Sequence, residues 1–213
     1  MKDLFCNERG NAAIYMVWLL GIVALIFLIA INIANVFVTG AQSSNISEQA
    51  AIAGTSVVVD ETKTAIEQFD DNPLSISTRE HHDMKPLAAV IEEKKNRYQQ
   101  TGLSASQAYI KALNDVLPEE IEEHELLKET IKSHFNSVNL STKIYDAVTS
   151  VVHSNHGNTA ETQVVLSNTK WRIEVSTSVD YHSISDQKYI PEITDKIDAE
   201  GFGPRLKYLE KVF

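Results

Sequence analysis

A stretch of 38 residues near the amino terminus, from Gly10 to Ser47, contains no Asp, Glu, Lys, Arg or His. Within it, the 20 residues Ala12 to Ile31 are apolar throughout, and 12 of them are Leu, Ile, Val or Phe. An α-helix of this length spans about 30 Å, the thickness of a bilayer's hydrocarbon core. The strongly apolar residues favour insertion by roughly 4 to 7 kcal/mol. The run therefore predicts a transmembrane helix, which we place at residues 11–38.

A cleaved secretory signal and a buried helix of a globular core are the two alternatives to a membrane anchor. A signal has a shorter apolar region, of about 7 to 15 residues, followed closely by small residues at a cleavage site. Here the run is longer, and no A-x-A pattern follows it closely. A core helix usually keeps a polar face, which Ala12 to Ile31 lacks. Both comparisons favour a membrane anchor that is kept.

The cations that flank the run predict its orientation. Lys2 and Arg9 precede the apolar residues, and the next Lys or Arg is Lys63. Because positively charged flanks stay on the cytoplasmic side of a membrane, we expect residues 1–10 to be cytoplasmic. The same rule predicts a single-pass protein whose carboxyl-terminal part lies outside the cell.

Composition excludes several classes of function. The chain of 213 residues suits one domain with an appendage. Its net charge of −10 argues against nucleic acid as a partner, because phosphate binding requires a basic surface. Cys6 is the only cysteine, so the chain forms neither an internal disulfide nor a thiolate zinc site.

Residues 39–72 are predicted to form a helical stem that continues the anchor. The sequence before Asp70 contains no proline, and Asp70-Asp71-Asn72-Pro73 marks the end of the stem. A restart of the helix after Gly40, capped by Ser44 or Ser47, remains open. The stem carries a smooth patch of small residues, which is a candidate helix-packing surface: Ala50, Ala51, Ala53 and Gly54. This patch is either ordinary core packing or a contact with another subunit.

The remaining residues, 73–213, are predicted to form an extracytoplasmic domain that begins with three helices. Pro86 suits the first turn of a helix that runs to about Tyr98. Ser104 and Gln107 have the spacing of a capping box and predict the start of the second helix. We expect Pro118 to start the third helix, and its acidic first turns to complement the helix dipole.

The end of the chain is predicted to contain a small antiparallel sheet. Apolar and polar residues alternate strictly from Trp171 to Tyr181, and 162–167 is expected to pair with this strand. The segment 144–152 alternates like a strand, although its spacing also fits a helix capped by Ser141; we favour a strand, because a lone hairpin is marginally stable. The tail after Gly201 suits a short helix or an edge strand. Together these elements predict an α+β fold.

None of the chemistry-bearing clusters forms a recognised catalytic or metal-binding pattern. The candidates are His81-His82-Asp83, His153 with His156, the helix-borne His124 and His134, the five glutamates between Glu119 and Glu125, and Asp60-x-Thr62-x-Thr64. Their spacings fit loops, solvated helix faces and helix ends better than metal ligation. No nucleophile elbow, phosphate loop or dinucleotide fingerprint is present. We therefore expect no enzyme activity, no catalytic residue, no cofactor and no metal.

The amino-terminal region resembles that of TadE/TadG-like proteins, which are pseudopilins and membrane-anchored components of bacterial Flp (tight adherence) pili. The similarity covers roughly residues 7 to 59: Glu8-Arg9-Gly10, one apolar helix, and the stem from Glu48 to Gly54. In this family, prepilin-type cleavage follows a glycine that has a glutamate five residues later. The corresponding position here is Gly10, but the fifth residue after it is Tyr15. The resemblance therefore implies an uncleaved, TadG-like anchor in the bacterial cytoplasmic membrane.

The resemblance implies a structural component of a Flp/Tad-type pilus or secretion assembly. Its partners would be the lipid bilayer, other membrane proteins of the assembly and, through the stem, further copies of the chain. Two alternatives remain open. One is an anchored ligand-binding or sensor ectodomain that uses the wet strand face of Arg172, Glu174 and His182. The other is a membrane-tethered hydrolase that uses scattered histidines and acids.

Overall fold

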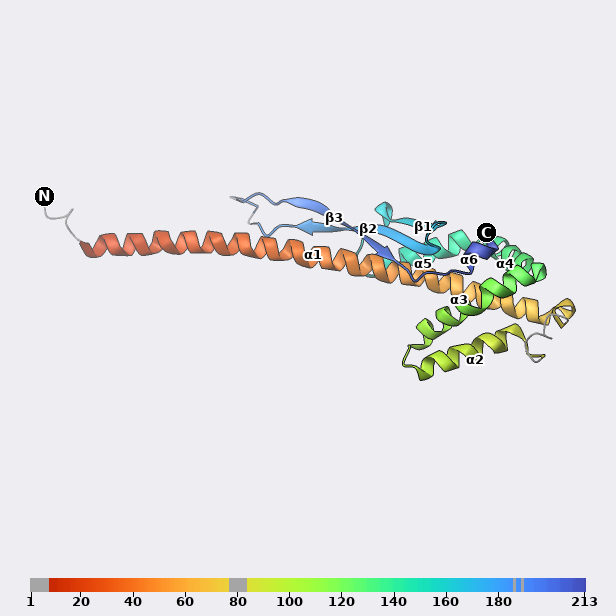
Figure 1. Ribbon diagram of the computed structural model, residues 1–213. Coiled ribbons are helices and arrows are strands. Elements are labelled where there is room, and N and C mark those ends of the chain that lie inside the picture. The colour runs from red at the N-terminus through yellow and green to blue at the C-terminus, as the bar shows by residue number, and fades with distance from the viewer. Residues whose placement is uncertain (1–7, 77–83, 186, 189) are drawn as a thin grey trace, which may run out of the picture.

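The computed structural model describes residues 8–76, 84–185, 187–188 and 190–213, which form an α+β fold (Figure 1). The first helix is far longer than the others, and its second half is the spine of the domain. A three-stranded antiparallel sheet lies along this spine, and shorter helices gather around its end (Figure 1). The predicted fold class is confirmed.

Helix α1, Glu8–Asp71, is a single helix of 64 residues. It passes through Gly40 without interruption, so the anchor segment and the stem segment are parts of one helix. At its end, the carboxylate of Asp70 accepts hydrogen bonds from the backbone N–H groups of Leu87 and Ala88, at 2.9 and 2.8 Å. Since Pro86 provides no side-chain cap, Asp70 satisfies the first turn of the next helix instead.

Helices α2, Leu87–Gln100, and α3, Ala105–Glu123, form the hairpin at the lower right of Figure 1. The capping box predicted at Ser104 and Gln107 is present. The prediction that Pro118 starts a helix is wrong, because Pro118 lies inside α3. Leu117 and Ile121 on either side of it are buried, and this packing carries the helix past the missing N–H.

The break that we expected at Pro118 occurs at His124, where α3 ends and α4, Glu125–Ser137, begins. Most of the acidic cluster therefore lies in the last turns of α3, at the carboxyl-terminal end of its dipole, and the predicted dipole complementarity holds only for Glu125. A salt bridge between Glu122 and Lys211 provides partial compensation. Glu120 also lies close to His124, at 3.7 Å from its Nε2.

The prediction of a strand at 144–152 is wrong: α5, Leu140–Ser154, is a helix that begins after Asn139. Its buried residues recur at a spacing of four, namely Leu140, Ile144, Val148 and Val152. This helical period places all four against α1, and tertiary packing thereby overrides the strand preference of the β-branched residues.

The sheet has the strand order β1-β2-β3, with β1 at Gln163–Ser167, β2 at Arg172–His182 and β3 at Thr194–Phe202. The predicted pairing of the first two strands is confirmed, with Val164 opposite Val175. The alternation along β2 is also confirmed except at one position, since Ile173, Val175, Thr177, Val179 and Tyr181 are buried. The exception is Ser178, which was predicted to face solvent and is buried as well. The third strand is β3, most of which precedes Gly201. For the tail after Gly201 we expected a short helix or an edge strand, and a short helix is present at Leu209–Val212.

The last residues fold back into the core after β3. Short helix α6, Leu209–Val212, is preceded by Leu206 and Tyr208, which are fully buried. The hydroxyl groups of Tyr208 and Thr62 are 2.8 Å apart inside this core and hydrogen-bond to one another. The carboxyl-terminal segment thus fastens onto the second half of α1.

Candidate functional site

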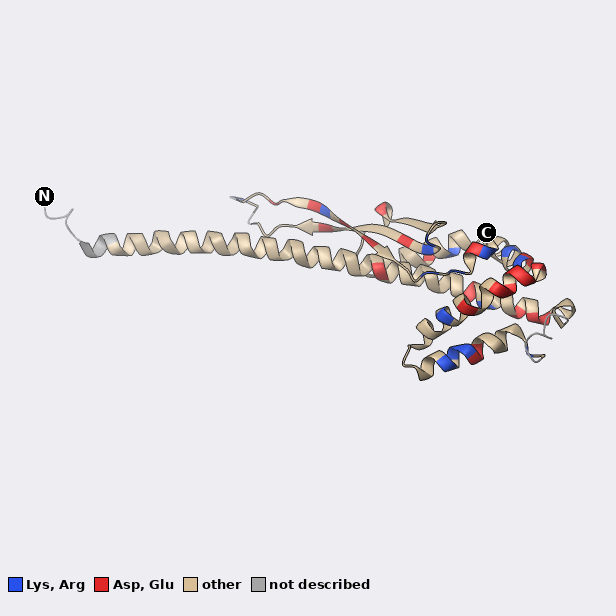
Figure 2. Cartoon of the chain, in the orientation of Figure 1, with Lys and Arg blue, Asp and Glu red and all other residues tan. Residues whose placement is uncertain are grey.

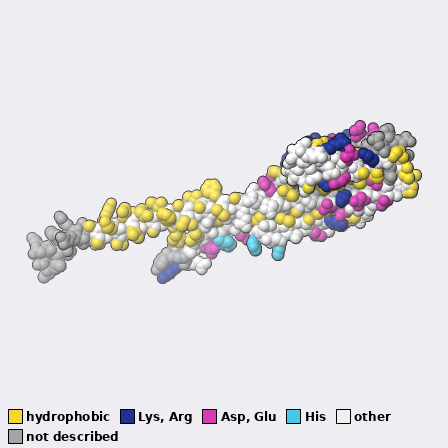
Figure 3. Space-filling model, turned by 90° about the horizontal axis from the view of Figure 1, so that it is seen from below, with side chains coloured by type: hydrophobic (Ala, Val, Ile, Leu, Met, Phe, Trp, Pro, Cys, Tyr) yellow, Lys and Arg dark blue, Asp and Glu magenta, His cyan; other side chains and the backbone are white. Residues whose placement is uncertain are grey.

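The first half of α1 is the largest apolar surface of the described residues, and no part of the domain covers most of it. Leu20 and Phe27 are 71% and 67% exposed, and no charged residue interrupts the helix between Gly10 and Ser47 (Figure 2). Apolar side chains surround the helix where it projects from the domain (Figure 3). Among the described residues, this is the one helix long and apolar enough to cross a membrane.

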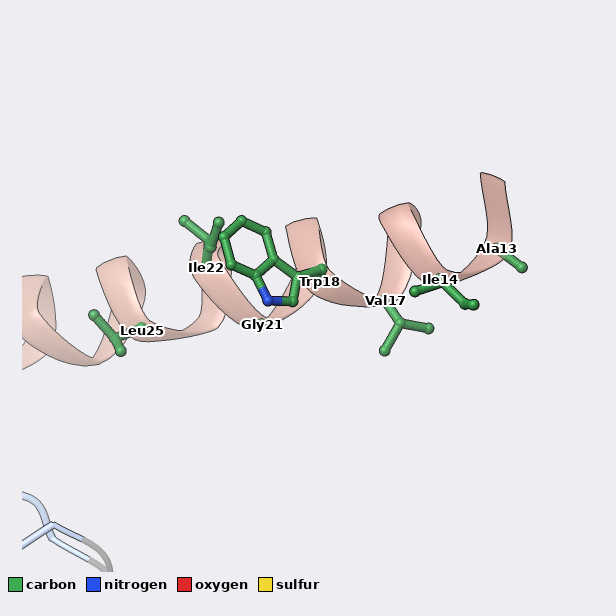
Figure 4. Close-up of a pocket in the computed structure, with 7 residues that line it drawn as sticks. All are labelled: Ala13, Ile14, Val17, Trp18, Gly21, Ile22 and Leu25. Carbon is green, nitrogen blue, oxygen red and sulfur yellow. The ribbon is translucent and has the colours of Figure 1, made fainter. Parts of the chain in front are cut away.

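A shallow hollow lies on this exposed helix around Gly21 (Figure 4). The indole ring of Trp18 lies beside Gly21 and Ile22, and no atom lies within 4 Å of the place where a Cβ of Gly21 would be. The other lining residues are also apolar: Ala13, Ile14, Val17 and Leu25. The hollow therefore offers an apolar partner a close approach to the helix backbone.

The small-residue patch of the stem lies inside the domain. Ala50 and Ala51 are fully buried, and Ala53 is half-buried. A Cβ added to Gly54 would meet the side chains of Val148 and Ile173 at 3.0 and 3.2 Å. The chain's own α5 and sheet thus occupy this face, and a second subunit has no access to its buried residues.

Two serines of the stem attach the sheet to α1. The hydroxyl of Ser43 donates to the carbonyl of Ile197 at 2.8 Å, and the hydroxyl of Ser47 lies 3.0 Å from the carbonyl of Ala199. Both serines are fully buried. Sequence reasoning treated Ser47 only as a helix cap, because the partners of helical serines are distant in the chain. The only signal for this contact in the sequence was the four-residue spacing of the serines, which places both on one face of the helix.

Gly10, the candidate processing position, lies in the first turn of α1. It therefore belongs to the same continuous helix as the apolar run that follows. This end of α1 projects away from the sheet and from the other helices (Figure 1).

Glu61 of α1 is at the centre of a polar cluster within the domain. Its carboxylate oxygens lie 2.8 Å from Nε2 of His134 and 2.6 Å from Nζ of Lys143. The hydrogen bond from Lys143 is the largest cause that lowers the pKa of Glu61, and His134 lowers it further. The cluster ties α4 and α5 to the spine. The three side chains thus form one polar contact between the spine and two of the shorter helices.

The other sequence candidates do not converge on a site. His81-His82-Asp83 lies outside the described residues, and within the described part no three His, Cys, Asp or Glu side chains could hold a metal ion. Arg172 pairs with Glu174 at 2.8 Å and lies over the ring of Phe202. His182 is ten residues farther along β2, which corresponds to roughly 33 Å of strand. Arg172 and His182 therefore lie too far apart to line one pocket, which is what the ligand-binding alternative would require.

Comparisons of the chain with protein-family models, with curated proteins and with solved structures found no match. The function is consequently argued from the chain's own residues. The features available for that argument are the exposed half of α1, its hollow around Gly21 and the way the helix enters the domain.

Proposed function

We propose that this protein is a membrane-anchored structural component of a Flp/Tad-type pilus or secretion assembly. The observation that carries the proposal is the exposed apolar half of α1, which is continuous with the spine of a folded α+β domain. An exposed apolar surface of this extent requires a partner outside the chain. A lipid bilayer is the partner that suits a helix without a polar face.

The orientation of the anchor follows from its flanking charges. Lys2 and Arg9 keep the amino terminus in the cytoplasm, and the acidic domain is exported. Cys6 provides the test, because it is the only cysteine. It should be protected from an impermeant thiol reagent in intact cells and become reactive after lysis.

The unbroken helix makes the anchor and the domain one mechanical unit. With a rise of about 1.5 Å per residue, the 64 residues of α1 extend roughly 96 Å. Because the anchor and the spine are one helix, the position of the anchor in the membrane also fixes the position of the sheet. A long amino-terminal helix with its second half against an antiparallel sheet is similar to the broad plan of pilins, and this analogy of fold supports the proposal.

The partner surface in this proposal is the hollow around Gly21, because the small-residue patch of the stem is already covered. Inside a bilayer, helices associate where small residues let their backbones approach. The hollow has this character at Ala13 and Gly21, which lie along one side of the helix. We therefore place the contact with other assembly subunits within the membrane.

Site-specific photo-crosslinking in membranes of the native host tests this function. A photoreactive residue replaces Val17, which is 74% exposed in the hollow, and the matched control replaces Phe37, which is equally exposed on the same helix but outside the hollow. We expect a discrete protein adduct at Val17 that is weaker or absent at Phe37, and retention of the chain in membranes after alkaline carbonate. Lipid adducts alone at both positions would support an anchored ligand-binding domain instead.

A further inference from the structure

The tip of the β2–β3 hairpin reaches back along α1 to Asn32, close to the end of the apolar run (Figure 1). The backbone N–H of Ile184 donates to Oδ1 of Asn32 at 2.7 Å. Nδ2 of Asn32 lies 3.4 Å from the carbonyl of Ile184, and the hydroxyl of Tyr181 lies 3.3 Å from the carbonyl of Asn32. One asparagine thus fixes the hairpin to the helix.

At the base of the tip, Ser183 and Ile193 pair with one another as well. The N–H of Ser183 donates to the carbonyl of Ile193 at 2.9 Å, and the N–H of Ile193 donates to the hydroxyl of Ser183 at 2.7 Å. A polypeptide that enters a lipid environment needs this internal pairing, because lipid offers no hydrogen bonds. The pairing at Ser183, Ile193 and Asn32 meets that need at the base of the tip.

An open apolar groove of about 450 Å³ separates the tip from the helix. Its helix side is formed by Leu28, Ile29, Ile33 and Val36, and its hairpin side includes Ile184, Ile190 and Ile193. The three hairpin isoleucines are 46%, 38% and 64% exposed, respectively. Exposed apolar side chains therefore line the groove and extend beyond it at the tip of the sheet.

Charged residues lie on both sides of these isoleucines: Lys188 and Glu192 belong to the tip itself and are exposed. Asp180 and His182 on β2 are exposed, as are Asp195 and Lys196 on β3. The side chain of His182 pairs with that of Glu192 at 3.0 Å. Exposed apolar side chains interleaved with charged ones are the pattern of a segment that lies at the boundary between lipid headgroups and acyl chains, where the charges face the headgroups.

We propose that the tip of the β2–β3 hairpin is a second membrane contact, which inserts Ile184, Ile190 and Ile193 into the outer leaflet and receives lipid acyl chains in the groove beside α1. The proposal rests on the proposed membrane anchor. The groove lies at Leu28 to Val36, where the span meets the outer interface, and is continuous with the apolar surface of α1. This continuity identifies lipid as the occupant. The contact holds the domain at a fixed height and tilt above the membrane.

Depth-dependent fluorescence quenching tests this contact in the full chain, reconstituted at one copy per lipid nanodisc. In a Cys6→Ser background, a polarity-sensitive fluorophore is attached to Ile190→Cys or, separately, to Ile193→Cys. Both side chains are more than one-third exposed, so the label does not disturb the core. The matched control is Val165→Cys, an exposed apolar position at the opposite end of the same sheet, where Val165 is 55% exposed. Quenching by lipids with brominated acyl chains is the measured quantity.

We expect several-fold stronger quenching at positions 190 and 193 than at position 165. Equal quenching at all three positions would overturn the proposal. An apolar fluorescence shift without quenching would also overturn it, because the groove would then be filled by protein. A label at Leu20→Cys separates the two proposals: quenching at position 20 without quenching at 190 and 193 refutes only the hairpin contact, whereas no quenching at position 20 refutes the anchor.

Discussion

The two halves of α1 are both rich in apolar residues, but they meet opposite environments. In the first half, large residues such as Leu20 and Phe27 are exposed on every side of the helix. In the second half, Val58 and Ile66 are buried while Asp60 and Glu67 on the same turns remain exposed. The second half is thus an ordinary amphipathic helix whose partner is its own domain. The first half has no polar side, so its partner must surround it.

Side-chain size differs between the halves for the same reason. The second half presents Ser47, Ala51 and Gly54 where strands and α5 come close, and these small residues allow the backbones to approach. The first half presents mostly large aliphatic and aromatic side chains to its surroundings, apart from the hollow at Gly21. Hydropathy identifies both halves as apolar. The size of the side chains and the spacing of the polar residues show which half packs against its own domain and which half needs a partner outside the chain.

Arginine substitutions should separate the two halves most strongly. Leu20→Arg combined with Val23→Arg places two charges in the span, at about 3 kcal/mol each, which offsets most of the insertion energy. We expect this variant to lose membrane retention in alkaline carbonate while its domain unfolds as in the wild type. Val58→Arg buries a charge in the core and should destabilise the domain by several kcal/mol while the chain stays in the membrane.

Fractionation and unfolding of the full chain in detergent micelles, followed by near-ultraviolet circular dichroism, measure the two effects. Ile52→Arg is the control, because Ile52 lies on α1 in the second half but is 52% exposed. It should leave both properties unchanged. If the double variant near Leu20 destabilised the domain as much as Val58→Arg did, the claim that the two halves of α1 have different partners would be wrong.

Local signals predicted the elements whose stabilising contacts are close in sequence. The end of α1 near Asp71, the capping box at Ser104 and the alternation along β2 depend on neighbouring residues and were predicted within a few positions. The same reasoning was wrong for α5 and Pro118, because distant packing decides both. Ile144 and Val148 face α1, nearly a hundred residues earlier in the chain.

The candidate surfaces were predictable only in part. The apolar run predicted the exposed half of α1, since composition alone defines it. The small-residue patch was identified, but its neighbours were not, because nothing near Gly54 in the sequence indicates Val148 or Ile173. The link between Asn32 and Ile184 spans 152 positions and left no local pattern.

Gly201→Ala should destabilise the domain by about 3 kcal/mol, the upper end of typical overpacking effects. A Cβ at this position would overlap the backbone of Ser47, where β3 crosses α1. Backbone atoms of a helix cannot rotate away as the end of a side chain can. Chemical unfolding in detergent measures the change.

Gly21→Ala is the matched substitution in the other half, where an added Cβ meets no atom within 4 Å. It should leave the free energy of unfolding of the domain unchanged. Equal stability of the two alanine variants would show that β3 does not depend on its close approach to α1.

Glu61→Gln should have the smallest effect, a loss of about 2 kcal/mol at neutral pH, because it removes charge-assisted hydrogen bonds with Lys143 and His134. The pKa of Glu61 is lowered in the folded state from its usual value of about 4.5. A lowered folded pKa contributes stability that is present above the unfolded pKa and is lost as pH falls through the folded one. The wild type should therefore converge on the variant as the solution is acidified below about pH 4.

Glu93→Gln is the control outside the spine: Glu93 also pairs with cations and also has a lowered pKa, but it lies on the exposed surface of α2. Water and salt screen exposed pairs, so this variant should follow the wild type at every pH. Parallel pH profiles for Glu61→Gln and the wild type would show that the ion pairs of Glu61 contribute no more to stability than those of the exposed Glu93.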